Sequence, residues 1–469
     1  MRWLAALLFL PAFAFAQGIP VPVAEALKRA GVPIEAVALV VREASGPAGN
    51  NRALVSHQPD KPMNPASVMK LATTAAALDL LGPAFTFKTE FYWRGELRGG
   101  VLEGDLHIKG GADPKLTYER LWVAMRQLRE RGIREIRGDI VLDRGYLAPL
   151  EHDSARFDGK ARRAYNVGPD ALLLNFKVVT LRFVPDGAAA RVIADPPIPS
   201  VEVMSRVKVV KNGGCGDWQE RLSMDVQETG LLATVSVEGN YAESCGERAW
   251  HVSVFDHARY DEALLRWLWS ESGGKLLGKV RDGPVPAEAK LVYTSESAPL
   301  AEIVRDINKY SNNVMARQVF LALSAELDKQ PGDATRSGAA VKQWLKDRGI
   351  EAPELVLENG SGLSRVERFS AGNTAALIDM MWKRALMPEF LSSLSLAAVD
   401  GTFRKRMNNE GFAGQAHLKG GTLNDVRAIA GQVLSRGGKR WTVVFVVNHP
   451  NAPATQVAQD VLLNWVYER

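Results

Sequence analysis

The strand-like segments of the main unit lie at the two ends of this chain, and this distribution limits the fold more than any other feature. Near the N-terminus, Glu35–Glu43 (EAVALVVRE) and Ala53–His57 are rich in β-formers and predict two strands. Near the C-terminus, short turns separate three further strand-like segments, which predict an antiparallel meander: 415–422, 427–435 and 441–448. Helical periodicity dominates residues 298–384. The pattern predicts an α/β (α+β) unit with a central antiparallel sheet flanked by helices.

A long insertion interrupts this unit. From about residue 89, strand-like runs flank a charged amphipathic helix at 116–131, and beyond residue 188 short alternating segments indicate a β-rich module. With 469 residues, roughly three domains are expected. We therefore predict a main domain split between 17–88 and 262–469, and an insertion at 89–261 that forms two smaller β-rich domains, about 89–187 and 188–261.

The charge balance excludes few partners. Lys and Arg number 58 against 53 Asp and Glu, a formal net charge of +5 spread over the whole chain. This would suit an anionic polymer or a membrane surface but requires neither. Basic residues do not form a run interleaved with aromatic residues, so nucleic-acid binding is not expected.

The first sixteen residues have the pattern of a secretory signal peptide. Arg2 precedes the apolar stretch Trp3–Ala16, and Ala14-Phe15-Ala16 forms an A-x-A cleavage site before Gln17. The alternative is a membrane anchor, but this stretch has 14 residues, whereas a spanning helix needs about 20. We predict residues 1–16 to be a cleaved signal and the mature protein to be periplasmic.

The two cysteines, Cys215 and Cys245, are separated by 29 residues inside the insertion. An oxidising compartment favours a disulfide between them, and the alternative is two buried thiols. The seven histidines are scattered and no Cys or His cluster has zinc spacing, so neither a metal site nor a cofactor is predicted.

The first candidate for chemistry is the pair Ser67 and Lys70. In N-P-A-S-V-M-K, followed by an Ala- and Leu-rich helical stretch, the two residues share a face of a helix near its start. A lysine whose pKa is lowered can remove the proton from a serine hydroxyl, and a helix N-terminus can stabilise an oxyanion. Alone, S-x-x-K also fits a helix cap beside an exposed lysine.

Two later motifs strengthen this interpretation. Ser311-Asn312-Asn313 fits S-x-N at a break between two helices, although Ser and Asn are also common helix caps. Lys419-Gly420-Gly421-Thr422 lies in a strand-like segment and could instead be an edge-strand lysine before a turn. In this order, the three motifs match the S-x-x-K, S-x-N and K-T-G set of β-lactamases and penicillin-binding proteins, with one substitution in the third.

With these motifs the chain resembles the class C low-molecular-mass penicillin-binding proteins, the D-alanyl-D-alanine carboxypeptidase/endopeptidase family. The resemblance extends over the mature chain and includes the long insertion and four further stretches: GDLHIKGGADPKL, YNVGPDALLLNF at 165–176, NGSGLSR at 359–365 and DGTFRKRM at 400–407. It implies a β-lactamase/DD-peptidase-like catalytic domain with two added domains.

The resemblance also implies roles for the motif residues. Ser67 would be the acylated nucleophile and Lys70 its general base. Ser311 would relay the proton to the leaving amine, Asn313 would bind the substrate amide, and Lys419 would polarise Ser311 and the terminal carboxylate. The remaining residues implied to bind substrate are Gly420, Gly421 and Thr422, with the N–H groups of Ser67 and Thr422 as the oxyanion hole. Gly420 departs from the family, which usually has Thr at this position.

The implied activity is that of a serine DD-peptidase. Its substrates would be peptidoglycan stem peptides, cleaved at a terminal D-Ala-D-Ala or at a cross-link, and β-lactams would be covalent inhibitors. Two alternatives remain: a β-lactamase, which would need a dedicated deacylation base, and a non-catalytic cell-wall binding module, which Gly420 would suit. Peripheral association with the membrane or cell wall and a homodimer are also left open.

Overall fold

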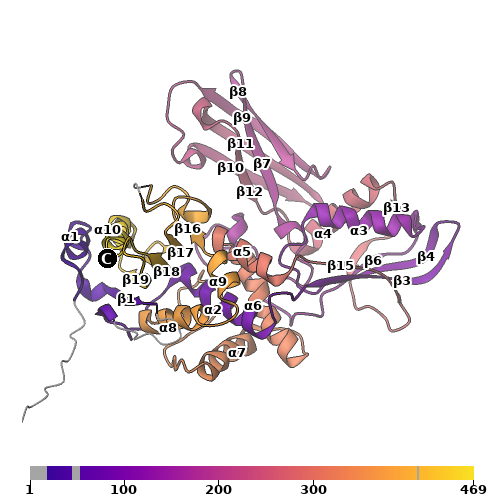
Figure 1. The fold of residues 1–469 in the computed structure, drawn as a ribbon. Coiled ribbons are helices and arrows are strands. Elements are labelled where there is room, and N and C mark those ends of the chain that lie inside the picture. Colours follow the sequence, from indigo (N-terminus) through magenta and orange to yellow (C-terminus); the bar gives the residue numbers. More distant parts are fainter. Residues whose placement is uncertain (1–17, 45–52, 409–410) are drawn as a thin grey trace, which may run out of the picture.

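The computed structural model describes residues 18–44, 53–408 and 411–469, so the predicted signal peptide and its cleavage site lie outside the described residues. One antiparallel sheet joins the two ends of the chain in the order β16-β17-β18-β19-β1-β2 (Figure 1). Its strands are β1 (Val37–Glu43), β2 (Ala53–His57), β16 (Ser395–Leu396), β17 (Ala416–Leu423), β18 (Val426–Leu434) and β19 (Arg440–Asn448). The predicted meander and its union with the N-terminal strands are confirmed.

Both faces of this sheet are buried at its centre, because alternate side chains of β1, β18 and β19 enter different cores. In β1, Ala38 and Val40 pack into one core while Leu39 and Val41 pack into the other. The first core is formed with helices α2 (Lys70–Leu80), α5 (Leu300–Tyr310), α6 (Asn313–Asp328), α7 (Ala334–Asp347), α8 (Ala371–Trp382) and α9 (Met387–Ser393). The second is formed with α1 (Val21–Arg29) and α10 (Gln456–Tyr467).

The insertion contains two further sheets, which project from the main unit (Figure 1). The first contains β3 (Lys88–Arg98), β4 (Val101–Lys109), β5 (Glu135–Ile136), β6 (Ile140–Asp143), β13 (Lys275–Leu276), β14 (Val280–Asp282) and β15 (Lys290–Glu296). Helices α3 (Tyr118–Glu130) and α4 (His257–Glu271) contribute to the core beside it. The second contains β7 (Val179–Asp186), β8 (Ala189–Asp195), β9 (Val201–Val210), β10 (Leu222–Thr229), β11 (Leu232–Ala242) and β12 (Arg248–Val252).

The strand pairing differs from two of the expected domain limits. β15 pairs with β3 through residues 290–296, so the chain leaves this sheet well after residue 261. The limit expected near residue 187 falls between β7 and β8, which pair with each other. The pairing of β15 with β3 joins distant segments and leaves no mark on a local pattern. β7 and β8 form a hairpin across a short turn, and a limit at residue 187 divides it.

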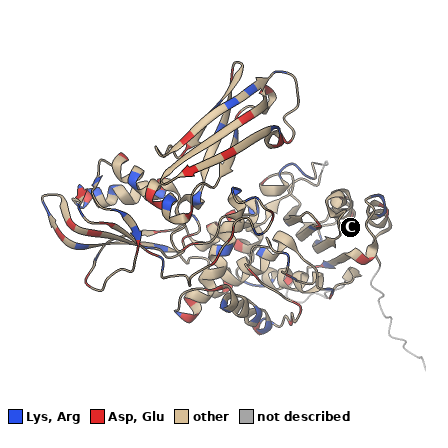
Figure 2. Cartoon of the chain, turned by 180° about the vertical axis from the view of Figure 1, so that it is seen from behind, with Lys and Arg blue, Asp and Glu red and all other residues tan. Residues whose placement is uncertain are grey.

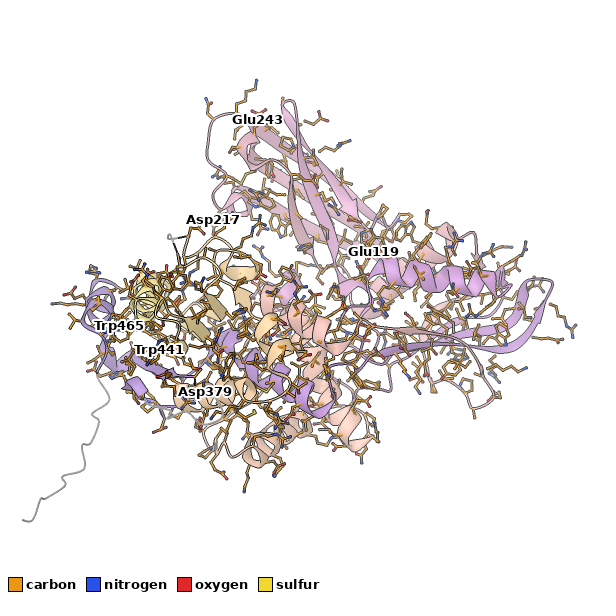
Figure 3. The ribbon with its side chains drawn as sticks, viewed as in Figure 1. Glu119, Asp217, Glu243, Asp379, Trp441 and Trp465 are labelled. Atoms are coloured by element: carbon orange, nitrogen blue, oxygen red, sulfur yellow. A yellow bond between two sulfur atoms is a disulfide. The ribbon has the colours of Figure 1, made fainter. Side chains whose placement is uncertain are left out.

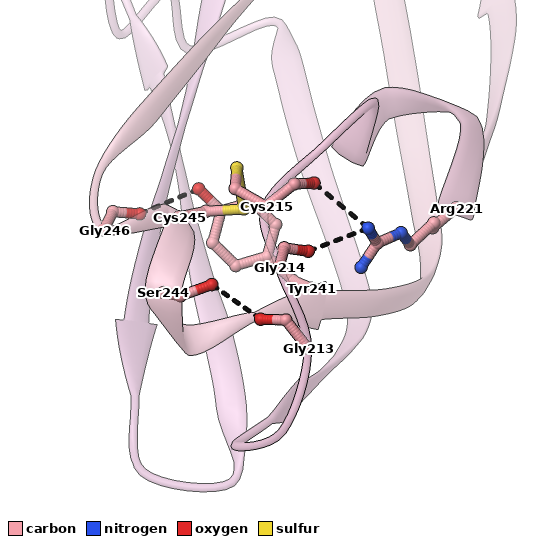
Figure 4. Close-up of a disulfide and its surroundings, with 8 residues drawn as sticks. All are labelled: Gly213, Gly214, Cys215, Arg221, Tyr241, Ser244, Cys245 and Gly246. Atoms are coloured by element: carbon pink, nitrogen blue, oxygen red, sulfur yellow. Dashed lines mark hydrogen bonds between the residues drawn. A yellow bond between two sulfur atoms is a disulfide. The ribbon is translucent and has the colours of Figure 1, made fainter.

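The predicted disulfide between Cys215 and Cys245 is present beside the second insertion sheet (Figure 4). Nearby hydrogen bonds hold the same loops: Arg221 donates to the carbonyl of Gly214 at 2.8 Å, and Ser244 Oγ donates to that of Gly213 at 2.8 Å. On the strands of both insertion sheets, Lys and Arg are interspersed with Asp and Glu (Figure 2).

Candidate active site

Ser67 lies in a 3₁₀ turn, Ala66–Met69, that leads directly into α2. Lys70 begins α2, is fully buried, and places its Nζ 3.0 Å from Ser67 Oγ. The turn before the serine is unusual, because Ala66 has φ +45°. Gly362 packs against it so closely that a Cβ there would lie 1.9 Å from the Ala66 carbonyl oxygen. The S-x-x-K pair is therefore positioned by a loop distant in sequence.

The Lys70 ammonium position is surrounded by three oxygen atoms. Besides Ser67 Oγ, these are Asn313 Oδ1 at 2.6 Å and the carbonyl oxygen of Ser361. Burial lowers the pKa of Lys70 well below its usual value, and the positive charges of Lys419 and Arg317 lower it further. The arrangement favours the neutral amine, which can accept a proton.

The break between α5 and α6 brings Ser311 and Asn313 to this lysine. Ser311 ends α5 in the left-handed conformation (φ 56°, ψ 35°). Asn312, not Asn313, caps α6, and its side chain accepts a hydrogen bond from Met315 N. This leaves the Asn313 carboxamide free of a capping role and in contact with Lys70.

Lys419 lies on β17 and reaches the site from the sheet. It is fully buried, and its Nζ donates to Ser311 Oγ and to the carbonyl of Gly420, both at 2.8 Å. Burial lowers the pKa of Lys419 to about 7. The structure thus brings together the five polar residues predicted from the sequence: Ser67, Lys70, Ser311, Asn313 and Lys419.

The three residues after Lys419 have different surroundings. A Cβ at Gly421 would lie 2.6 Å from the Pro65 carbonyl oxygen and 3.1 Å from Ser67 N, so β17 runs against the nucleophile's backbone. Thr422 is exposed, and its hydroxyl accepts a hydrogen bond from Arg427 Nη1 at 2.8 Å. A Cβ at Gly420 would lie 3.3 Å from the ring of Phe403, in the DGTFRKRM stretch.

Sequence reasoning missed Glu367 as a functional residue. This fully buried carboxylate accepts hydrogen bonds at 2.9 to 3.1 Å from four backbone N–H groups, those of Glu358, Asn359, Gly360 and Gly362. It therefore shapes the loop whose Ser361 carbonyl accepts from Lys70. The charge of Glu367 raises the pKa of Lys70 and so opposes the effect of burial. A Glu after a Gly-rich loop was the available signal, but nothing local links it to Lys70.

The described residues offer neither a metal site nor a membrane-spanning helix. Across residues 18–44, 53–408 and 411–469, no group of three or more His, Cys, Asp or Glu side chains could hold a metal ion. Among the helices that the structure describes, none combines the length and apolar character needed to cross a membrane.

Comparisons with known proteins identify the family of this chain. Residues 22–467 match the D-Ala-D-Ala carboxypeptidase 3 (S13) family. The D-alanyl-D-alanine carboxypeptidase DacB of Haemophilus influenzae is 23% identical over 403 residues, covering 85% of this chain and 83% of the relative. A D-alanyl-D-alanine carboxypeptidase of Actinomadura sp. is 26% identical over 422 residues, covering 87% and 78%.

Solved structures show the same fold. Penicillin binding protein 4 from Haemophilus influenzae superposes with a TM-score of 0.77 at 22% identity, covering 96% of this chain and all of that one (100%). A predatory endopeptidase from Bdellovibrio bacteriovorus gives 0.51 at 15% identity, covering 92% of both chains. The expected mixed α/β fold of a DD-peptidase is confirmed. Since the family match runs through nearly the whole described chain, this protein belongs to the D-Ala-D-Ala carboxypeptidase 3 (S13) family.

Proposed function

We propose that this protein is a serine D-Ala-D-Ala carboxypeptidase/endopeptidase that works through an acyl-enzyme on Ser67. One observation carries the proposal: a fully buried lysine of lowered pKa lies 3.0 Å from the Ser67 hydroxyl. The neutral Lys70 amine takes the hydroxyl proton as Ser67 Oγ attacks the carbonyl carbon of the penultimate D-Ala. Attack at the corresponding D-Ala carbonyl of a cross-link gives the endopeptidase reaction.

The other site residues complete the acyl transfer. The N–H groups of Ser67 and Thr422 stabilise the developing oxyanion, and the close approach of β17 to Ser67 N supports this pairing. Ser311, hydrogen-bonded to Lys419, passes a proton to the leaving amine, and Asn313 binds the substrate amide. Lys419 also attracts the terminal carboxylate, beside Gly420 and Gly421. Water then hydrolyses the ester and releases the shortened peptide.

The substrate class and compartment belong to the same proposal. Two relatives are D-alanyl-D-alanine carboxypeptidases, and a solved structure of similar fold was obtained with a β-lactam. We propose peptidoglycan stem peptides as substrates, β-lactams as covalent inhibitors, and the periplasm as location after cleavage at Ala16. This proposal is compatible with peripheral association with the membrane or cell wall and with a homodimer.

We propose a split catalytic domain, with the insertion's end moved from residue 261 to about 296. The pairing of β15 with β3 supports the later limit, since a strand belongs to the unit that supplies its hydrogen bonds. Within the insertion, a division near residue 178 keeps β7 with the sheet that it joins.

Acylation by penicillin tests the proposal. Intact-mass measurement should show one adduct on the wild-type protein, and peptide mapping should place it on the segment containing Ser67. S67A should give no adduct, and K70A should lose acylation while keeping its fold. An adduct on S67A would overturn the assignment. Fast turnover of a chromogenic β-lactam would indicate the alternative, a β-lactamase, and no acylation of any kind would favour a non-catalytic binding module.

A further inference from the structure

A large cavity lies outside the site described above, where the loop after β6 meets the start of α4 and the end of β10. Its volume is about 900 Å³. The charged residues that line it are Asp143, Arg144, Arg162, Asp170, Lys177, Glu228, Asp256, Arg259 and Asp282. Which of these charges are already neutralised decides what the cavity could bind.

The charge of each arginine that lines the cavity is neutralised by an ion pair. Arg144 pairs with Asp170, with Asp261 at 2.6 Å and with Asp282 at 2.8 Å. The pairs around Glu228 involve Arg162 and Arg259, and Arg259 also contacts Asp256 at 2.8 Å.

The remaining acid, Asp143, is held by the backbone. Its carboxylate accepts hydrogen bonds from Gly145 N and Val285 N, both at 2.9 Å. Every carboxylate lining the cavity thus already has a partner.

Lys177 and His257 are different. Lys177 is 6% exposed, and its Nζ donates to the carbonyl of Phe255 at 2.8 Å, but it forms no ion pair with any residue in the described part of the chain. An ammonium has three protons to donate. His257 Nδ1 is buried with no hydrogen bond to a described residue, and the Asp170 carboxylate is 3.8 Å away. Lys177 therefore keeps donor capacity that an anionic acceptor can use. Burial lowers the pKa of His257 to about 4, so this ring is neutral and its Nδ1 donates in the tautomer that carries the proton there.

The backbone that carries Lys177 is strained. Asn175, Phe176 and Lys177 have φ of 47°, 55° and 51°, three consecutive non-glycine residues in the left-handed region. Hydrogen bonds from Asn175 Nδ2 to the Val178 carbonyl (3.1 Å) and to Tyr260 Oη (3.2 Å) hold the turn. Such strain persists only where the surroundings enforce it, and it clusters at functional sites.

The cavity adjoins a second one that lies nearer the active site. It shares Leu150, His152 and Pro169 with a second cavity of about 340 Å³. Asn359 and Ser364 line that second cavity, on the loop whose Ser361 carbonyl contacts Lys70.

We propose that Lys177 and His257 bind a carboxylate of an extended peptidoglycan peptide whose scissile bond lies at Ser67. The inference rests on the proposed function. A cross-linked pair of stem peptides carries carboxylates besides the one at the scissile end, whereas a short D-Ala-D-Ala peptide with a neutral N-terminal part carries only that one. The cavity therefore favours cross-linked over short substrates.

Steady-state kinetics of K177M on both substrates test the proposal. KM for a purified cross-linked stem-peptide dimer should rise roughly tenfold or more, the effect of losing a hydrogen bond to a charged group. Hydrolysis of diacetyl-L-Lys-D-Ala-D-Ala should keep its wild-type KM and kcat. K275M is the control: Lys275 is an exposed lysine of the insertion, 3.2 Å from Glu135. This variant should keep the wild-type KM and kcat for both substrates. Equal KM values for wild type and K177M on the dimer would overturn the proposal.

Two measurements keep the test decisive. If K177M does not fold, H257F takes its place with the same expected split between substrates. Calorimetric titration of S67A with the dimer and with sodium citrate separates two sources of carboxylate: citrate binding that depends on Lys177, without dimer binding, would overturn the substrate version. If wild-type protein hydrolyses neither substrate, the proposed function fails and not this site alone.

Discussion

At the scale of single residues, Lys70 is the group on which the proposed chemistry depends, and its proton affinity results from opposing effects. Burial lowers its pKa, the charges of Lys419 and Arg317 act in the same direction, and Glu367 raises it. Glu367 also organises the loop that supplies the Ser361 carbonyl. One carboxylate therefore influences both the charge and the position of the lysine.

We predict that E367Q shifts the acid limb of the acylation rate to lower pH. Lys70 must be neutral to act as a base, and without the negative charge its pKa falls, so it stays neutral at lower pH. The free energy of unfolding should also fall, because a Gln NH₂ group would face a backbone N–H and leave that donor unpaired, at a cost of about 1–3 kcal/mol. Stopped-flow acylation by a β-lactam across the pH range measures the first effect, and chemical denaturation measures the second.

D379N is the matched control for this variant. Asp379, labelled in Figure 3, is a buried carboxylate of α8 that pairs with Arg42 of β1 at 2.5 Å. Its loss should lower the free energy of unfolding without moving the acid limb. An identical pH profile for wild type and E367Q would contradict the role given to Glu367.

Gly420 departs from the family, and the structure gives the departure a physical context. The backbone there is not left-handed, so a side chain is conformationally allowed. A Cβ would, however, lie 3.3 and 3.4 Å from two atoms of the buried Phe403 ring, which would have to move by a few tenths of an ångström. Whether a Thr hydroxyl can reach a substrate carboxylate thus depends on the packing of Phe403.

We predict that G420T alone lowers the free energy of unfolding by roughly 1–3 kcal/mol, the usual cost of overpacking. In an F403L background the same change should be tolerated and should lower KM for a D-Ala-D-Ala peptide by roughly tenfold, through one hydrogen bond to the carboxylate. Chemical denaturation and steady-state kinetics of the four proteins in this cycle measure both effects. Full stability of G420T with unchanged KM would show that Phe403 does not limit the site.

At the scale of elements, the 3₁₀ turn Ala66–Met69 and α2 together carry both residues of the S-x-x-K motif. Nine of the eleven residues of α2 are buried, so its Ala- and Leu-rich sequence reflects a central helix rather than a surface one. The turn before it is set by contacts from β17 and the loop at 359–365.

For the second insertion sheet, we predict that the double variant C215S/C245S unfolds this sheet before the main unit. The bridge closes a loop with a sequence separation of 30, worth roughly 3–4 kcal/mol in the chain-entropy model. Limited proteolysis should cut within residues 179–252 while penicillin acylation continues at the wild-type rate. Free-thiol titration of the denatured wild-type protein is the control and should find no thiol. If the double variant loses acylation together with the structure of this sheet, the sheet supports the active site.

At the scale of the whole molecule, the second insertion sheet is removable in principle, because its first and last strands are neighbours. Val179 of β7 pairs with Val252 of β12, so the chain enters and leaves the sheet at one place. We predict that replacing residues 180–251 by a short Gly-Ser linker preserves acylation of Ser67. Thermal stability should fall, since this sheet shares a hydrophobic core with α3 and α4. A folded truncation that penicillin cannot acylate would show that the sheet shapes the catalytic cleft.

Local patterns of the sequence were sufficient for five strands of the main sheet but not for the two-residue β16, and also for most helices and for the five polar residues of the candidate site. Strand alternation and helix periodicity are short-range properties, so β1, β18 and α10 could be located from a few residues each. The order of the three motifs identified the family because their spacing follows from the order of the elements that carry them. The disulfide was predicted from an isolated pair of cysteines in a chain expected to be secreted, and it is confirmed.

Only the tertiary structure decided how these parts act on one another. The Ser361 carbonyl that contacts Lys70 lies 291 residues further along the chain, and β15 pairs with β3, which begins at Lys88. The lowered pKa values of Lys70 and Lys419 arise from burial, which depends on everything packed around each lysine. Lys177, which forms no ion pair with a described residue, likewise owes its surroundings to the complete fold. Sequence determines these features only through the complete fold, because Coulomb interactions and desolvation depend on distances in space and not on spacing along the chain.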